Sequence, residues 1–191
     1  KDTNAVERIK QISIQGPDSA RGETPSSGNM EKAALTDLRQ WQQFYRGNTN
    51  FPSTPQPQDP ARDVLFALGK YDTVLSELHE ANRRPYAQFP VHYAEGMEVL
   101  LPNLGVLKSL SMVLRLRTTA YLEAGQTDEA LRDIKLNFRL AEPLKSEPML
   151  ISHLVRIAIL QITLNSIWEG LANHRWNEPQ LAELQKTLAS I

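Results

Sequence analysis

LRLRTTAYLEAGQTDEALRDIKLNFRLAEP, residues 114–143, contains two helical patterns with a turn of about three residues between them. Apolar residues three and four apart run up to Tyr121 in the first pattern and from Ala130 to Ala141 in the second. The first pattern stops at Ala124-Gly125, where glycine readily ends a helix. Because such a short link keeps neighbouring helices antiparallel and in contact, the stretch predicts a helical hairpin.

Further helical patterns flank this hairpin. Apolar spacing and proline positions predict helices from Asp59 to just before Pro85, from near Pro102 into the hairpin, from near Pro148 to Leu171, and from Asn177 onward. No alternating run is long enough for a sheet, and Val6–Gln15 is the only candidate strand. Residues 59–191 are therefore predicted to form one all-α domain of antiparallel helical hairpins.

The first 58 residues have a different character. Gly-Pro, Thr-Pro-Ser-Ser-Gly and Phe51–Pro57 are loop signals, and the prolines of the last segment favour extended backbone. One helix, at about residues 30–46, interrupts the region, with Asn29 as its cap and Gly47 as its stop. Trp41 and Tyr45 are expected to dock this helix on the main domain. The prediction for residues 1–58 is an irregular, loop-rich N-terminal arm.

Residues 114–143 resemble one unit of the tetratricopeptide family. The match rests on Tyr121, Gly125, Ala130, Leu131 and Pro143, which stand at about the family's offsets. Arg117, Thr118 and Ile134 depart from the family's pattern, and no second copy follows at a period of about 34 residues. The resemblance implies stacked helix hairpins, as a tetratricopeptide-like array or a bundle, and it does not carry over a peptide-binding groove.

The chain from Asp59 to Ile191 is also similar to a group of uncharacterised bacterial envelope-associated proteins. The runs Arg84–Pro90 and His153–Ile159 carry this similarity. It implies a location at the cell envelope or in the periplasm rather than the cytoplasm, with a hydrophobic anchor upstream of Lys1. It implies no activity.

Composition excludes several classes of function. The net charge is -1 over 191 residues, so no global field favours nucleic acid as a partner. Cysteine is absent, which removes thiol catalysis, thiolate metal sites and disulfides. Residues 149–171 are the most apolar stretch, but His153, Arg156 and Glu169 interrupt it. That stretch is interpreted as a buried helix, so no membrane span is predicted within the chain.

A polar and aromatic cluster lies between the predicted helix that begins at Asp59 and the one that begins near Pro102. Its candidate ligand-binding residues are Arg84, Tyr86, His92, Tyr93 and Glu95. Arginines and aromatic hydroxyls on an irregular segment suit an anionic or sugar ligand. The alternative interpretation is a connector between helices, pinned by its aromatic rings, with its polar groups in solvent.

His153 and Arg156 lie three residues apart on the long apolar helix, and hence on one face of it. They are candidate ligand-binding residues of a pocket between helices, because a buried arginine needs a partner. Glu95, Glu98 and Asp133 are the candidate partners. The alternatives are a structural polar network or a helix edge that faces water.

The sequence contains no recognisable catalytic or cofactor motif. Its four histidines fall on separate predicted elements, so no metal site is predicted. No Gly-x-Ser-x-Gly turn and no glycine-rich phosphate loop occur, and no cofactor is predicted. Arg132, Lys135 and Arg139 form a basic stripe that is best interpreted as a solvated helix face.

These observations favour a non-enzymatic scaffold or protein-interaction module. Its partner would be a protein or peptide that buries an apolar anchor in a groove between helices. The alternative is a helical enzyme or small-ligand-binding protein that uses a polar pocket around His153 and Arg156. The sequence names neither the partner nor the oligomeric state.

Overall fold

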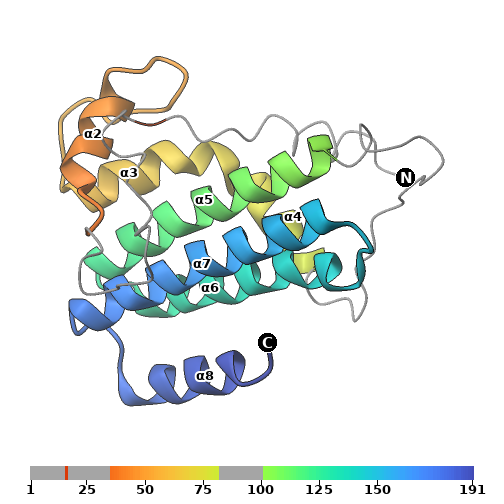
Figure 1. Cartoon of the computed structure of the whole chain (residues 1–191). Helices are drawn as coiled ribbons and strands as arrows, with labels where there is room; N and C mark the ends of the chain where they lie inside the picture. The colour runs from red at the N-terminus through yellow and green to blue at the C-terminus, as the bar shows by residue number, and fades with distance from the viewer. Residues whose placement is uncertain (1–15, 17–34, 82–100) are drawn as a thin grey trace.

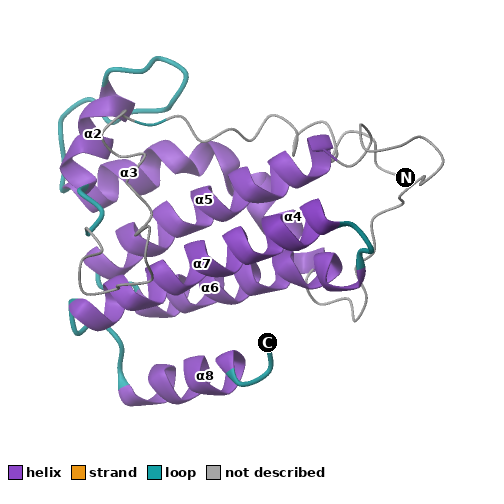
Figure 2. Cartoon of the chain, in the orientation of Figure 1, coloured by secondary structure: helices purple, strands orange, loops and turns teal. Residues whose placement is uncertain are grey.

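The computed structural model describes residues 16, 35–81 and 101–191, with side chains from residue 104 onward in the last range. Within these ranges every regular element is a helix (Figure 2). The predicted all-α fold is therefore confirmed. The candidate strand at Val6–Gln15 lies outside the described residues.

Helix α2 spans Leu38–Arg46. The predicted start near residue 30 is wrong, because residues 35–37 are not helical and Asp37 is the cap. The Asp37 side chain accepts a hydrogen bond from the Arg39 amide, which satisfies one of the free donors at a helix start. The helix ends at Gly47 as predicted.

The helix predicted from Asp59 to Pro85 is divided in two. Helix α3 spans Pro60–Leu68, the 3₁₀-helix η3 spans Gly69–Tyr71, and α4 spans Asp72–Ala81. Asp59 caps α3 through the Ala61 amide, as expected. The break falls at glycine, the poorest helix former after proline. It brings the Tyr71 ring to 6.4 Å from the Phe51 ring, edge to face.

The predicted hairpin is present. Helix α5 spans Leu101–Glu123 and α6 spans Thr127–Ala141. Gly125 turns the chain with a φ of 74°, a conformation that glycine adopts without steric cost. Ala130 is fully buried, and Tyr121 packs against the same apolar cluster. Whether this hairpin is a tetratricopeptide-like unit stays a prediction.

The C-terminal part follows the predicted pattern. After the 3₁₀-helix η6 (Glu142–Ser146), α7 spans Leu150–Ala172 and α8 spans Glu178–Leu188. His174, which lies between these two helices, has a φ of 50° and so interrupts the helical backbone. Asn177 and Gln180 form a capping box that starts α8.

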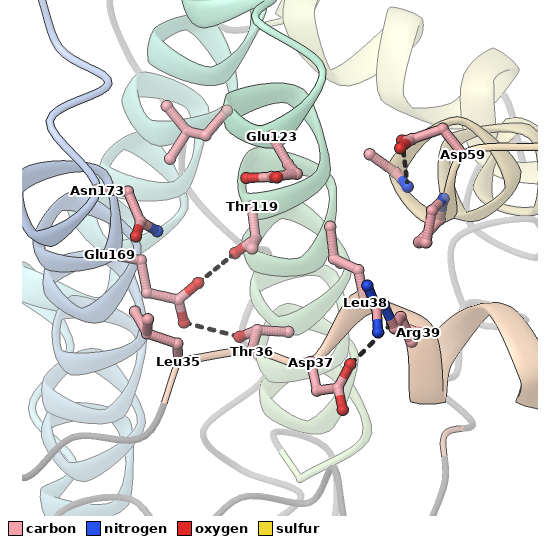
Figure 3. Close-up of a pocket in the computed structure, with 13 residues that line it drawn as sticks. Leu35, Thr36, Asp37, Leu38, Arg39, Asp59, Thr119, Glu123, Glu169 and Asn173 are labelled. Carbon is pink, nitrogen blue, oxygen red and sulfur yellow. Dashed lines mark hydrogen bonds between the residues drawn. The ribbon is translucent and has the colours of Figure 1, made fainter.

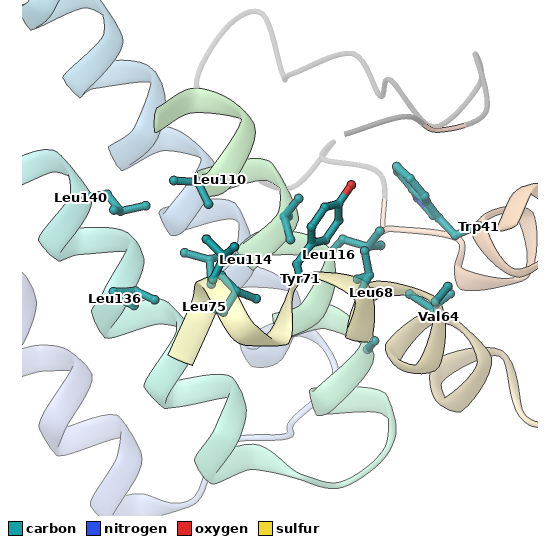
Figure 4. Close-up of a cluster of buried hydrophobic side chains, with 14 of the residues drawn as sticks. Trp41, Val64, Leu68, Tyr71, Leu75, Leu110, Leu114, Leu116, Leu136 and Leu140 are labelled. Atoms are coloured by element: carbon teal, nitrogen blue, oxygen red, sulfur yellow. The ribbon is translucent and has the colours of Figure 1, made fainter. Parts of the chain in front are cut away.

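The three long helices α5, α6 and α7 run side by side, and each contacts the other two (Figure 1). Helix α3 packs on α5, α2 packs on α3, and α8 contacts α6. The larger apolar cluster joins α2 to α7, and Figure 4 shows part of it around Tyr71, Leu114 and Leu136. Trp41 and Tyr45 belong to this cluster, so α2 docks on the domain as expected.

Candidate functional site

The most unusual feature of the described residues is the side of α7 that faces solvent. Five large aliphatic residues on this helix are 42–74% exposed: Leu150, Leu154, Ile157, Leu164 and Leu171. With the half-buried Gln161 and Trp168 they occupy positions spaced four, three, four, three, four and three residues apart. We call these seven residues the α7 seam. The spacing places all of them along one line of the helix.

The side of α7 that faces the domain includes several small and polar residues. Ser152, Thr163 and Ser166 are at most 1% exposed. Asn165, Glu169 and Gly170 are also buried. The large aliphatic residues of α7 that pack against the domain are Ile159, Ile162 and Ile167, which are buried, and Ile151, Val155 and Leu160, which are partly buried. A surface helix of a globular protein normally keeps polar and charged residues on its exposed side. Helix α7 instead has large aliphatic side chains on both sides, and part of its buried side is hydroxyl, amide and glycine.

Small inward residues explain how α7 fits. A β-carbon on Gly170 would lie 2.2 Å from Trp176 Nε1, so only glycine leaves room for the indole. Trp176 Nε1 donates to the Ile167 carbonyl at 3.1 Å, which ties the segment after α7 back onto the helix. Thr163 and Ser166 donate to carbonyls four residues earlier and so satisfy their own hydroxyls.

A buried carboxylate fixes the C-terminal half of α7. Glu169 accepts hydrogen bonds from Thr36 Oγ1 at 2.7 Å and from Thr119 Oγ1 at 2.8 Å. Arg115 lies 3.3 Å from the same carboxylate, so the buried charge has a partner. These contacts join α5, α7 and the segment before α2, and they hold the α7 seam in one orientation.

A second buried network holds the α5–α6 hairpin against α4. Arg117 donates from Nε to Asp133 at 3.0 Å, from Nη1 to Asp72 at 2.7 Å and from Nη2 to the Tyr121 hydroxyl at 2.8 Å. His79 Nε2 lies 3.3 Å from the Asp133 carboxylate. Burial alone would lower the pKa of Arg117, but Asp133, Tyr121 and Asp72 raise it above its ordinary value. The guanidinium therefore stays charged, and the network is structural.

A pocket of about 340 Å³ lies between α2, α3, α5 and α7 (Figure 3). Its acidic groups already have partners. Asp37 and Asp59 cap helices, Glu123 pairs with Arg175 at 2.8 Å, and Glu169 is bonded as described above. These carboxylates already make contacts that stabilise the fold. The pocket is therefore a weaker candidate for ligand binding or catalysis than its acidic lining alone would indicate.

The predicted ligand-binding residues are only partly described. Arg84, Tyr86, His92, Tyr93 and Glu95 lie outside the described residues. His153 and Arg156 are half-buried in the first turns of α7 and do not line the pocket. His153 lies about 24 Å and Arg156 about 20 Å along the helix from Glu169. Asp133, one candidate partner of Arg156, instead pairs with Arg117.

Helix α7 is also apolar over most of its length. Among the described residues it is the one helix long and apolar enough to cross a membrane, by length and composition alone. The interpretation of this stretch as a buried helix is correct for one side and wrong for the α7 seam. Leu154, Ile157 and Leu164 lie in the stretch predicted to be buried, but they are 42–57% exposed.

Comparison with known proteins gives no relative. No protein-family model, no curated protein and no solved structure matches the chain.

Proposed function

We propose that this protein is an interaction module that binds another protein through the α7 seam. The observation that carries the proposal is the line of exposed aliphatic side chains on α7, which includes Leu154, Ile157 and Leu164. Contiguous exposed apolar patches on a soluble protein mark binding surfaces. Single exposed aliphatic residues scattered over a surface need no such explanation, but five on one helical line do.

The mechanism of binding would be removal of these side chains from water. Each fully buried leucine or isoleucine contributes about 1.5–3 kcal/mol, so a partner that covers the α7 seam gains substantial free energy. The buried contacts of Glu169 with Thr36 and Thr119 keep α7 in place, which limits the entropy lost on binding. A rigid helix with one apolar line suits a partner that is itself helical or presents a groove.

A site-specific photocrosslinker tests this proposal. Benzoylphenylalanine in place of Ile157 should give discrete crosslinked adducts in cells of the organism that makes the protein. The same group in place of Arg132, on the exposed side of α6, should give far less. Equal labelling at both positions, or no adduct at position 157, would overturn the proposal.

One observation favours a second candidate function, binding of a small anion near His153 and Arg156. Arg156 Nε and Ser152 Oγ are buried without a hydrogen-bond partner among the described residues. A guanidinium with a free donor is suited to a carboxylate or phosphate. Isothermal titration with phosphate and citrate should give a signal that Arg156→Met removes, and no heat with either anion would rule this candidate out.

A further inference from the structure

We infer that the partner of the α7 seam is a second copy of this chain, with the two α7 helices parallel and Gln161 opposite its own copy. The inference rests on the proposed function and names its partner.

The spacing of the α7 seam is that of a coiled coil. Four and three residues alternate without interruption across all seven positions, which gives a mean period of 3.5 residues. A helix that only covers a globular core follows 3.6 residues per turn and a wider stripe, whereas 3.5 keeps a narrow line facing another helix. One set of positions has Leu150, Ile157, Leu164 and Leu171, and the other has Leu154, Gln161 and Trp168.

Gln161 selects the kind of partner. It is the polar member of the α7 seam and stands in the middle, with three positions on either side. A lipid surface or an apolar groove would leave its amide without hydrogen bonds, which is costly. A second α7 supplies an identical amide that both donates and accepts. In a parallel pair equal positions share a layer, so the two amides meet, and such a polar residue fixes register and strand number.

The residues beside the α7 seam allow two copies to approach. The flanking positions contain no lysine, arginine, aspartate or glutamate; they are Ile151, His153, Ala158, Leu160, Asn165, Ile167 and Ala172. Arg156 and Glu169 are one step further round the helix. Two copies therefore meet without repulsion between like charges along the line of contact.

The area indicates a weak dimer. A helix of 23 residues is about 35 Å long and about 10 Å wide, so the α7 seam offers a strip of roughly 350 Å² per copy. A stable specific interface buries about 800 Å² per partner. The α7 seam alone therefore offers less than half of that area per copy. We therefore expect association that depends on concentration.

Two measurements on the whole chain test the inference. Sedimentation equilibrium should give a mass that rises from 21.6 kDa towards twice that value as concentration increases. Ile157→Lys should hold the mass at the monomer value. Phe66→Lys, which changes a residue of similar exposure on α3, should behave as the wild type. Circular dichroism and thermal melting check that both variants fold.

The second measurement uses the absence of cysteine from the chain. Leu150→Cys, at one end of the α7 seam, should form a disulfide-linked dimer on mild oxidation, many-fold faster than Arg132→Cys on the exposed side of α6. A wild type that stays monomeric at all concentrations would overturn the inference, and so would equal rates for the two cysteine variants. An antiparallel pair would place position 150 beside position 171 of the other copy, about 30 Å from its own equivalent. It would dimerise by mass without rapid linkage at position 150, which overturns the parallel arrangement.

The outcomes separate this inference from the proposed function. A monomeric protein whose photocrosslinker at position 157 captures a different protein retains the proposed function and loses the inference. Flotation with phosphatidylcholine vesicles, if Ile157→Lys prevents it and no dimer forms, overturns both in favour of a lipid surface. Loss of every adduct and of the dimer also overturns both.

Discussion

The Nε atom of Arg117 donates to the Asp133 carboxylate at 3.0 Å, and this bond joins α5 to α6 inside the domain. The side chains are 10% and 1% exposed, so the pair is removed from water. Asp72 and His79 of α4 contact the same pair. A buried ion pair with satisfied hydrogen bonds is costly to break from one side, because the remaining charge stays buried.

Replacing Arg117 with methionine should therefore destabilise the protein strongly. The variant leaves the Asp133 carboxylate buried without its cation, and the expected loss is about 3–5 kcal/mol of the free energy of unfolding. Urea denaturation followed by circular dichroism measures it. Arg132→Met is the matched control, because Arg132 and its partner Glu129 are about half exposed. That control should cost less than about 1 kcal/mol. Equal losses would contradict the assigned role of Arg117.

Replacing Asp63 with asparagine should make the stability of the protein less dependent on pH in the acid range. Burial alone would raise the pKa of Asp63, but hydrogen bonds from Gln42, Gln58 and Thr54 and the nearby Arg46 guanidinium lower it. A carboxylate with a lowered folded-state pKa stabilises the protein above the unfolded-state pKa of about 3.9, and this stability is lost as pH falls through the folded-state pKa. The wild type should be more stable than Asp63→Asn at pH 7.

That advantage should shrink below about pH 4, and melting temperatures measured from pH 7 to pH 2 would follow it. A stability difference between the two proteins that stays constant over this range would show that the Asp63 carboxylate does not carry the effect.

Two glycine-to-alanine changes should have opposite signs. An alanine β-carbon at position 170 would lie 2.2 Å from Trp176 Nε1, so the indole must move and its bond to the Ile167 carbonyl is lost. Such overpacking costs about 1–3 kcal/mol. At Gly105, exposed within α5, no atom lies within 4 Å of the added carbon. Gly105→Ala should stabilise by about 0.5–1 kcal/mol through helix propensity. Thermal melts of both variants decide the signs.

Two nearby positions on α7 should differ in how much stability a change of side-chain size costs. Ser166→Leu inserts a large side chain where the serine is 1% exposed, and it should cost about 1–3 kcal/mol. Leu164→Ser removes a large side chain that is 42% exposed, and at low protein concentration it should cost much less. Denaturation of dilute protein measures both. A larger loss from Leu164→Ser would place the core of the domain on the other side of α7.

The helices could largely be predicted from local signals, because caps and breakers act within a few residues. Asp59 before Pro60, Gly125 after α5 and Asn177 before Pro179 each mark an element boundary that the structure contains. The start of α2 was missed because Asn29 and Asp37 are both acceptable caps, and local sequence does not rank them. The break at Gly69 was missed because glycine is tolerated inside helices.

The site was much harder to predict than the helices. The periodicity of Leu154 and Ile157 predicts one apolar face of a helix, but a period does not say whether that face is buried. The polar groups on the buried side of α7 have partners far away in the sequence. Glu169, for example, accepts hydrogen bonds from Thr36 and Thr119. Arg117 was noted as a departure from a repeat pattern, and its bonds to Asp72 and Asp133 supply the reason for it.

The amino-acid sequence by itself determined that this chain is helical, where most helices begin and end, and that α5 and α6 are antiparallel, since capping and short turns are local physics. The tertiary structure alone decided which side of α7 meets the domain. That choice depends on where α5 and α6 place their own side chains, and it leaves the leucines and isoleucines of the α7 seam in water.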